Sequence, residues 1–280
     1  MIKFKLNLFY KELVLFGLTL FLGLFSAVRL LGQNPFLNQK AEFKLQDFIV
    51  LAIFVIILLL LRRKKKAIGI IYKIFLLLVV VSGSQIIFNS FVAYPLDILL
   101  TLLLVVFFLF CPNVLTHNLA IIFGIAGIGT VVGLGVTPTT ALFLLIVLSF
   151  YDIVAVYKTR HMVEMAKGMV ESGAIFGFVI PSKISNLFSH RDEARSKIGL
   201  TAQADGEFMI LGSGDIGLPL IMVCSLVPIS LSAALVTAAF SLVGLLATHL
   251  IFVNQSQRRP MAALPPIATM TIIGYLITLI

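Results

Sequence analysis

The chain has 280 residues, of which 60% are hydrophobic and only 12% are charged, and it contains no Trp. Soluble domains average about 45–50% apolar and about 25% charged residues. A soluble protein of this composition would leave too much apolar surface in water, and intrinsic disorder requires low hydrophobicity. The composition therefore predicts a membrane protein with several spanning helices.

Apolar runs separated by charges, Pro and Gly predict nine transmembrane helices and an all-α, polytopic fold. The helices are expected near residues 12–32, 45–61, 67–91, 95–111, 118–136, 138–157, 206–227, 229–253 and 261–280. The longest connection gives three parts: a six-helix part over 1–157, a cytoplasmic loop over 158–205 and a three-helix part over 206–280. Within the loop, 161–180 is mildly amphipathic and is expected to form an interfacial helix, whereas 181–199 is polar and expected to be mobile.

The net charge of +9 would suggest a nucleic-acid partner in a soluble protein. Here it indicates orientation, because of the 21 Lys and Arg residues all but Arg29, Lys40 and Lys44 fall on one side of the nine-helix layout. The positive-inside rule then places the N-terminus in the cytoplasm and the C-terminus outside. The basic run at 62–66 is interpreted as an anchor that fixes the orientation of the neighbouring helices in the membrane. The lipid bilayer is therefore expected as a partner, and nucleic acid is not.

Two acidic residues lie well inside apolar runs, where an ionisable group is expensive and functional by default. Asp152 lies on the sixth expected helix, about six residues from its cytoplasmic end, and Asp215 about nine residues into the seventh. At 1.5 Å per residue these depths are roughly 9 Å and 13 Å. Consecutive antiparallel helices therefore place both carboxylates at a similar level, where they are expected to face each other.

A facing carboxylate pair in a low-dielectric site cannot ionise twice at low cost, so the two groups share a proton. That charge state suits an aspartic protease, in which one Asp activates water and the other donates to the scissile carbonyl. Gly212, Gly214 and Gly217 around Asp215 leave the backbone open to close approach and local unwinding.

Three motifs lie on three of the expected helices: Tyr151-Asp152 on the sixth, Gly212-Ser213-Gly214-Asp215 on the seventh, and Ala262-Ala263-Leu264-Pro265-Pro266 at the start of the ninth. They resemble the YD, GxGD and PALP motifs of presenilins and signal peptide peptidases. The order of the motifs, their spacing and the nine-helix layout match over essentially the whole chain. The segment 152–162 looks especially like the microbial (archaeal) presenilin homologues, and the expected orientation is that of presenilins.

The resemblance implies an intramembrane aspartyl endopeptidase that cleaves transmembrane segments of other proteins, in a prokaryotic cell membrane. It implies that Asp152 and Asp215 are catalytic. It also implies a set of substrate-binding or site-shaping residues: Tyr151, Gly212, Ser213, Gly214, Ala263, Leu264 and Pro265. Two positions depart from the family pattern, because Ser213 stands where many relatives have Leu, a position tied to substrate preference, and Ala262 replaces the first Pro of PALP.

A helical substrate hides its scissile carbonyl in its own hydrogen bonds, so it must unwind before cleavage. The unwound segment is expected to add as a strand against protein backbone, and the segment 263–266, whose prolines interrupt a regular helix, is a candidate edge for it.

Two other functions fit part of the sequence. An ion or small-molecule transporter or channel also uses paired intramembrane carboxylates and a glycine-broken helix, and a non-catalytic membrane scaffold would keep the same fold. Neither a metal nor a cofactor is expected, because the His and Cys residues share no ligand spacing. The spacing Gly129-x-x-x-Gly133 is typical of close helix packing in membranes, and His249 is interpreted as an interior or interfacial histidine of the eighth helix.

Overall fold

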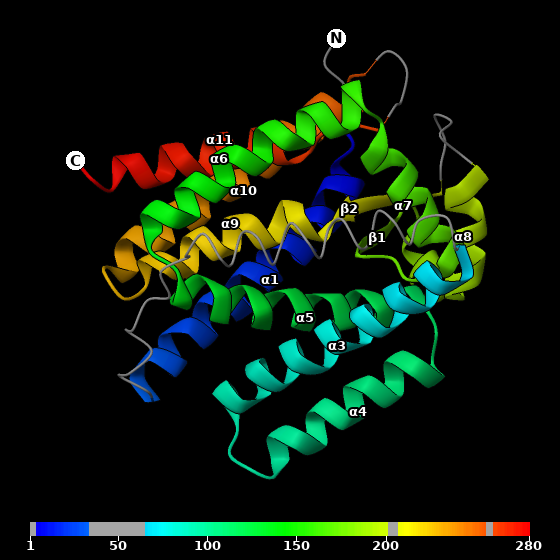
Figure 1. The fold of residues 1–280 in the computed structure, drawn as a ribbon, viewed down its shortest axis with the longest axis horizontal. Helices are drawn as coiled ribbons and strands as arrows, with labels where there is room; N and C mark the ends of the chain where they lie inside the picture. Colours follow the sequence, from blue (N-terminus) through cyan, green and yellow to red (C-terminus); the bar gives the residue numbers. More distant parts are fainter. Residues whose placement is uncertain (1–3, 34–64, 201–206, 256–259) are drawn as a thin grey trace.

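The computed structural model describes residues 4–33, 65–200, 207–255 and 260–280, and within these ranges it is a helical bundle with one small sheet (Figure 1). The apolar helices are α1 (Leu6–Gln33), α3 (Lys65–Phe91), α4 (Leu96–Phe110), α5 (Val114–Gly135), α6 (Pro138–Ile153), α9 (Ser213–Leu226), α10 (Leu231–Val253) and α11 (Leu264–Ile277). The elements between α6 and α9 are the π-helix η2 (Val154–Lys158), α7 (His161–Ser172), strand β1 (Gly177–Pro181), the 3-10 helix η3 (Ile184–Phe188), α8 (Arg191–Leu200) and strand β2 (Phe208–Gly212).

Five described helices are long and apolar enough to cross a membrane. They are Leu6–Gln33, Gly69–Phe91, Val114–Gly135, Pro138–Lys158 and Leu231–Val253. The helices α4, α9 and α11 are apolar but shorter. These eight helices overlap eight of the nine that the sequence predicts, and the predicted helix at 45–61 lies outside the described residues. The count of nine spans and the orientation of the two ends stay predictions.

Helix α5 lies inside the bundle and contacts α1, α3 and α9. The glycine spacing on α5 explains the close approach to α9, because a side chain at Gly129 would meet Leu220 at 2.7 Å and one at Gly133 would meet the Cβ of Cys224 at 2.5 Å. On another face, a side chain at Gly127 would collide with the backbone of Gly83 on α3. The predicted packing role of Gly129 and Gly133 is therefore confirmed.

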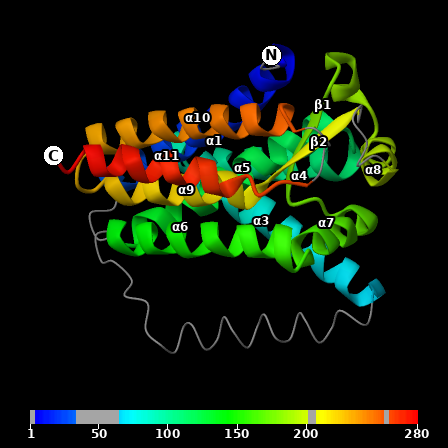
Figure 2. The same cartoon turned by 90° about the horizontal axis from the view of Figure 1, so that it is seen from above.

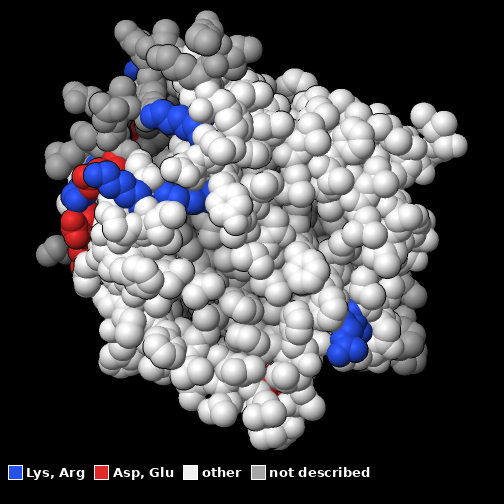
Figure 3. Space-filling model, turned by 180° about the vertical axis from the view of Figure 1, so that it is seen from behind, with Lys and Arg blue, Asp and Glu red and all other residues white. Residues whose placement is uncertain are grey.

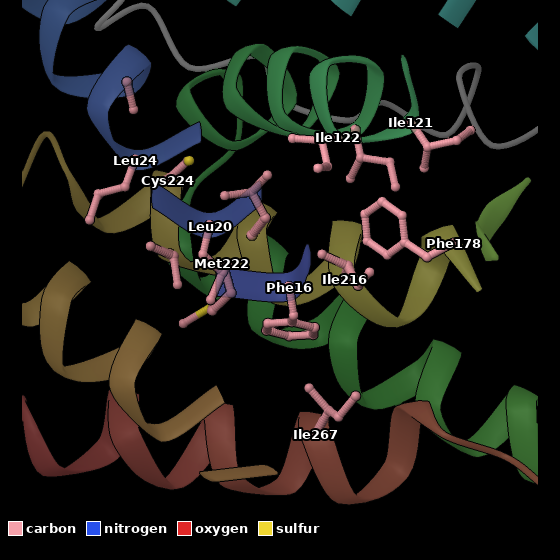
Figure 4. Close-up of a cluster of buried hydrophobic side chains, with 14 of the residues drawn as sticks. Phe16, Leu20, Leu24, Ile121, Ile122, Phe178, Ile216, Met222, Cys224 and Ile267 are labelled. Atoms are coloured by element: carbon pink, nitrogen blue, oxygen red, sulfur yellow. The ribbon is translucent and has the colours of Figure 1, made fainter. Parts of the chain in front are cut away.

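The hydrophobic core lies where α1, α5, α9 and α11 meet. Figure 4 shows Phe16 and Leu20 of α1, Ile122 of α5, Met222 of α9 and Ile267 of α11 converging between the helices. Strand β1 contributes Phe178 to the same cluster. The sheet is thus anchored in the apolar core of the bundle rather than lying loosely on its surface.

Charged side chains gather toward the end of the molecule where α7 and α8 lie. In Figure 3 most of the charged atoms gather at that end, a separate blue patch lies near the opposite side, and most of the visible face is uncharged. This distribution suits a belt of lipid-facing surface that ends at a polar interface.

The segment between α6 and α9 is more structured than the sequence predicts. Helix α7 accounts for the first part of the expected interfacial helix, but it ends at Ser172, where Gly173 adopts a left-handed conformation (φ 77°). The polar stretch 181–199 contains η3 and most of α8. The expected helix start near residue 206 is wrong, because residues 208–212 form β2, antiparallel to β1 with Val179 opposite Ile210 and Gly177 opposite Gly212.

A buried acid–base pair joins the two ends of the chain. Glu12 of α1 accepts a hydrogen bond from Nδ1 of His249 of α10 at 3.0 Å, and both side chains are buried. The rings of Phe4 and Phe9 pack against the His249 ring. Of the two positions expected for His249, interior and interfacial, the structure shows a side chain buried inside the protein, with Glu12 as its partner.

Candidate active site

Asp152 lies near the end of α6, in the apolar helical stretch Pro138–Lys158. The helix begins at an N-cap, Thr137, whose hydroxyl accepts the backbone N–H of Thr140, followed by Pro138 in the first turn, where Pro is well tolerated. The Asp152 side chain is 5% exposed, and its Oδ2 accepts the backbone N–H of Leu264 at 3.3 Å.

The start of α11 explains why Leu264 has an N–H available for Asp152. The first N–H groups of a helix have no partner within the helix, but Pro265 and Pro266, which follow Leu264, have no N–H at all. The Leu264 N–H is thus the free donor that this helix end presents to the carboxylate. The carbonyl of Ala263 accepts the Thr248 hydroxyl of α10 at 3.3 Å, which ties the helix start to its neighbour.

Asp215 lies in the first turn of α9 rather than deep inside a helix. Gly212 is the N-cap of α9, so Asp215 occupies the third helical position. From there its carboxylate accepts the backbone N–H of Gly212, as the third residue does in a capping box. The positive end of the helix dipole also favours a carboxylate at this position. The predicted depth of about nine residues is wrong because β2 replaces the first turns of the expected helix.

The two carboxylates nevertheless lie close enough to interact electrostatically. Helices α6, α9 and α11 contact one another and run side by side (Figure 2), and the negative charge of Asp152 acts on Asp215. Two carboxylates that interact in an apolar interior share a proton. The arrangement can therefore offer a base and an acid to the same water molecule and carbonyl group.

The two glycines of the Gly212-Ser213-Gly214-Asp215 motif have different surroundings. A methyl group at Gly212 would lie 3.0 Å from Oδ2 of Asp215, closer than the carboxylate tolerates without moving, whereas a methyl group at Gly214 would enter open space. Between them, the backbone N–H of Ser213 donates to the Phe176 carbonyl at 3.2 Å. Ser213 thus extends the β1–β2 ladder to the first residue of α9.

The remaining predicted residues surround the aspartates less closely. Tyr151 is 53% exposed, although it directly precedes the buried Asp152. Ala262 and Leu264 are buried, and Ala263 and Pro265 are partly buried. The described residues contain no group of three or more His, Cys, Asp or Glu side chains that could hold a metal ion.

Sequence reasoning missed three side chains that hold the small sheet. They bind backbone carbonyls on the edge of β1 that faces away from β2. On α5, His117 binds the carbonyl of Gly177 and Asn118 binds that of Val179, and on α1, Lys11 binds that of Pro181. The available signal was the polar pair His117-Asn118 in the first turns of an otherwise apolar helix. The sequence did not show its target, because β1 was not expected.

A surface network holds the other end of β2. Lys197 of α8 contacts Glu193 at 2.9 Å and Glu207, the residue before β2, at 2.7 Å. The hydrogen bond from Lys197 lowers the pKa of the Glu207 carboxyl. The pair is therefore ionised at neutral pH, and it is lost as the pH falls through that lowered pKa.

Comparisons with known proteins identify the family and the fold. The profile of the family "Signal-peptide peptidase, presenilin aspartyl protease" matches residues 24–280. Two solved structures of a presenilin family intramembrane aspartate protease, in space groups C222 and P2, match with TM-scores of 0.58 and 0.59 and identities of 21% and 20%. Each match covers 94% of this chain and 94% of the other. No curated protein matches the chain significantly.

The solved structures show a shared, presenilin-like fold, and the family profile covers most of the chain. With five described helices long enough to span a bilayer, the chain is a multi-pass membrane protein. It belongs to the signal-peptide peptidase and presenilin family of aspartyl proteases.

Proposed function

We propose that this protein is an endopeptidase that hydrolyses peptide bonds within transmembrane segments of other membrane proteins, with Asp152 and Asp215 as its catalytic residues. One observation carries the proposal: the Asp152 and Asp215 carboxylates interact electrostatically where α6, α9 and α11 contact one another. Each carboxylate also receives a backbone N–H, from Leu264 and from Gly212, which fixes its position.

The shared proton defines the reaction. The ionised carboxylate removes a proton from water, whose oxygen bonds to the scissile carbonyl carbon, while the protonated carboxyl group donates to the carbonyl oxygen. The C–N bond of the resulting tetrahedral diol then breaks, and the amine leaves with a proton returned by a carboxyl group. No other reactant is needed, because water supplies the atoms that end up on the two products.

The substrate must present an unwound segment to the carboxylates. The segment 263–266 is a poor edge for it, because α11 begins at Leu264, the Leu264 N–H and the Ala263 carbonyl have partners, and the prolines lack N–H groups. Strand β2 is the better candidate. Among described residues it pairs only with β1, and it runs directly into α9 and Asp215, so a strand added to its second edge reaches the carboxylates.

The proposal includes the organisation inferred from the sequence. The part over 1–157 supplies Asp152, the part over 206–280 supplies Asp215 and the start of α11, and the loop over 158–205 joins them on the cytoplasmic side of a prokaryotic cell membrane. The partners are transmembrane helices of other proteins. Tyr151, Ser213, Gly214, Ala263 and Pro265 are proposed to shape the site around the substrate.

Cleavage of a tagged single-span protein in liposomes tests the function. We expect the wild type to cleave it and the Asp152→Ala and Asp215→Ala variants to lose cleavage completely. Asp97→Asn is the matched control, because Asp97 is also a buried carboxylate in an apolar helix but is held by Gln85 of α3 at 2.8 Å. Cleavage that survives either active-site substitution would overturn the proposal, and ion flux without cleavage would indicate a transporter instead.

A further inference from the structure

Strand β1 has one edge that faces away from β2, and side chains from two helices occupy it. The carbonyl of Gly177 lies 3.1 Å from Nε2 of His117, and the carbonyl of Pro181 accepts a hydrogen bond from Nζ of Lys11 at 2.7 Å. Between them, Val179 binds Asn118. Since alternate residues of a strand point their backbone groups to opposite sides, these three residues form the whole outward edge of β1.

Asn118 acts on this edge as a strand would. Its Nδ2 donates to the Val179 carbonyl at 2.8 Å, and its Oδ1 accepts the Val179 N–H at 2.9 Å. A carboxamide carries a donor and an acceptor side by side, so it reproduces the pair of groups that a neighbouring backbone would offer. The Asn118 side chain is 1% exposed, so water does not compete for these bonds.

The sheet depends on such support. A two-stranded sheet is marginal by itself, and this one has five residues in each strand. Every residue of β1 is buried, so its backbone groups need protein partners rather than water. Removing Asn118 would leave the N–H and the carbonyl of Val179 buried and unpaired, which is more damaging than losing an exposed hydrogen bond.

The sheet in turn fixes Asp215. Val179 lies opposite Ile210 and Gly177 lies opposite Gly212, and Gly212 is the N-cap whose N–H reaches the Asp215 carboxylate. The backbone bond between Ser213 and Phe176 carries the ladder into α9. A displacement of β1 therefore moves Gly212 and the first turn of α9, and with them the carboxylate.

We infer that Asn118 is a positioning residue for Asp215, acting through Val179, the β1–β2 pair and Gly212, with His117 and Lys11 holding the same edge. The inference rests on the proposed protease function. It also assigns the two edges of the sheet different roles: side chains of α5 and α1 occupy the edge of β1, and β2 keeps the edge at which a substrate strand adds.

The first test is Asn118→Leu, which keeps the branching at Cγ, enlarges the side chain and removes both hydrogen bonds. We expect kcat/KM for a single-span substrate to fall at least ten-fold. Thr130→Val is the matched control on the same helix, because the buried Thr130 hydroxyl binds the carbonyl of Gly23 on α1, away from the sheet. Wild-type activity in Asn118→Leu, or an equal loss in Thr130→Val, would overturn the inference.

A disulfide separates positioning from general stability. Val179 and Ile210 are paired across the strands, so a disulfide formed by Val179→Cys and Ile210→Cys is expected to lock the sheet. The variant also carries Cys111→Ser, which removes the exposed native thiol. When the disulfide variant also carries Asn118→Leu, its oxidised form is expected to recover a kcat/KM within about three-fold of the same disulfide variant with Asn118. Reduction of the disulfide is expected to abolish this recovery of activity. A locked sheet without recovery would contradict a role through β1 and β2.

Asn118→Asp gives a second variant with the same shape. A protonated carboxyl group has one donor and one acceptor, as the carboxamide has, whereas the ionised form has no donor for the Val179 carbonyl. Its activity relative to wild type at the same pH is therefore expected to rise as the pH is lowered. A constant ratio across the pH range would count against the assignment.

Hydrogen exchange distinguishes failure of the inference from failure of the protease function. The amides of β2 are expected to exchange faster in Asn118→Leu than in wild type or in Thr130→Val. If the wild type cleaves nothing, the proposed function fails, and exchange still decides whether Asn118 holds the sheet. If exchange in β2 is unchanged, the inference fails whatever the enzyme cleaves.

Discussion

The two halves of the active site hold their carboxylates by different means. Asp152 lies in the last turn of α6 and accepts the N–H of Leu264, which is 112 residues away in the chain. Asp215 lies at a helix start and receives its N–H from Gly212, only one turn away. One half thus depends on how α6, α10 and α11 pack, and the other depends on a local cap and on the sheet behind it.

This difference shows that perturbations reach the two carboxylates by separate routes. Helix packing acts on Asp152 through the start of α11, where Thr248 of α10 binds the Ala263 carbonyl. The loop between α6 and α9 acts on Asp215, through β1 and β2. Variants along one route are expected to leave the opposite carboxylate in place.

The largest effect is expected on stability, when the buried pair of Glu12 on α1 and His249 on α10 is broken. Glu12→Ala leaves His249 without its partner, and breaking a buried pair in this way is expected to lower the free energy of unfolding by about 3 kcal/mol. SDS titration in mixed micelles measures the change. The double variant Glu12→Leu with His249→Phe is expected to recover most of the loss, because no polar group is then left buried alone; equal losses in the two variants would contradict this account.

A smaller loss, confined to catalysis, is expected from the Asp152 half. Replacing Leu264 with its α-hydroxy acid turns the amide into an ester, which removes the N–H and also weakens the Ala263 carbonyl as an acceptor for Thr248. Hydrogen bonds to charged groups contribute about 1.5–3 kcal/mol, so kcat is expected to fall about 10-fold to 100-fold with unfolding little changed. The same replacement at Leu276, later in α11, is the control, and an equal loss of activity there would remove the special role of the Leu264 donor.

The Asp215 half is tested by its two glycines. Gly212→Ala places a methyl group 3.0 Å from the carboxylate and is expected to lower kcat about ten-fold, because the reacting group is displaced. Gly214→Ala projects into open space, where only a substrate would meet it, and is expected to raise KM instead. Steady-state kinetics separate the two, and a kcat effect confined to Gly214→Ala would reverse the assignment.

The smallest effect is expected at the exposed start of β2. Lys197→Met removes the partner of Glu207, but exposed ion pairs contribute little, so cleavage at pH 7 is expected to change less than two-fold. Because the pKa of Glu207 is lowered by Lys197, the wild-type pair is lost at acidic pH, and the small difference between variant and wild type is expected to vanish there. A large effect at neutral pH would show that α8 controls the sheet.

The sequence was sufficient to predict the family and most helices, and it singles out the two aspartates as candidates, because each of these has a local signal. Apolar runs give the helices, and charged residues within them, such as Asp152, stand out. The packing glycines Gly129 and Gly133 were also identified by spacing alone. Helix order predicted that Asp152 and Asp215 lie at a similar level, and their electrostatic interaction is consistent with this, although the estimated position of Asp215 within its helix did not hold.

What could not be predicted depends on long-range contacts. In the sequence, the residues of β2 resemble the apolar start of a helix, because five apolar residues fit a strand or a helix equally well. Only their pairing with β1 decides that they form a strand. The role of Asn118 required knowledge of β1, and the donor role of Leu264 required the position of α6. Glu12 was placed at a helix start, where nothing in the neighbouring sequence indicates a partner 237 residues later.

The pair of Glu12 and His249 has a consequence for the order of synthesis. At translation rates of about 5–20 residues per second, the 237 residues between them take roughly 10–50 s to make. Throughout that interval the first helix carries a carboxyl group whose final partner does not yet exist. The first helix therefore reaches its final place only after α10 has been synthesised, so the bundle closes around the active site late, when its last helices arrive.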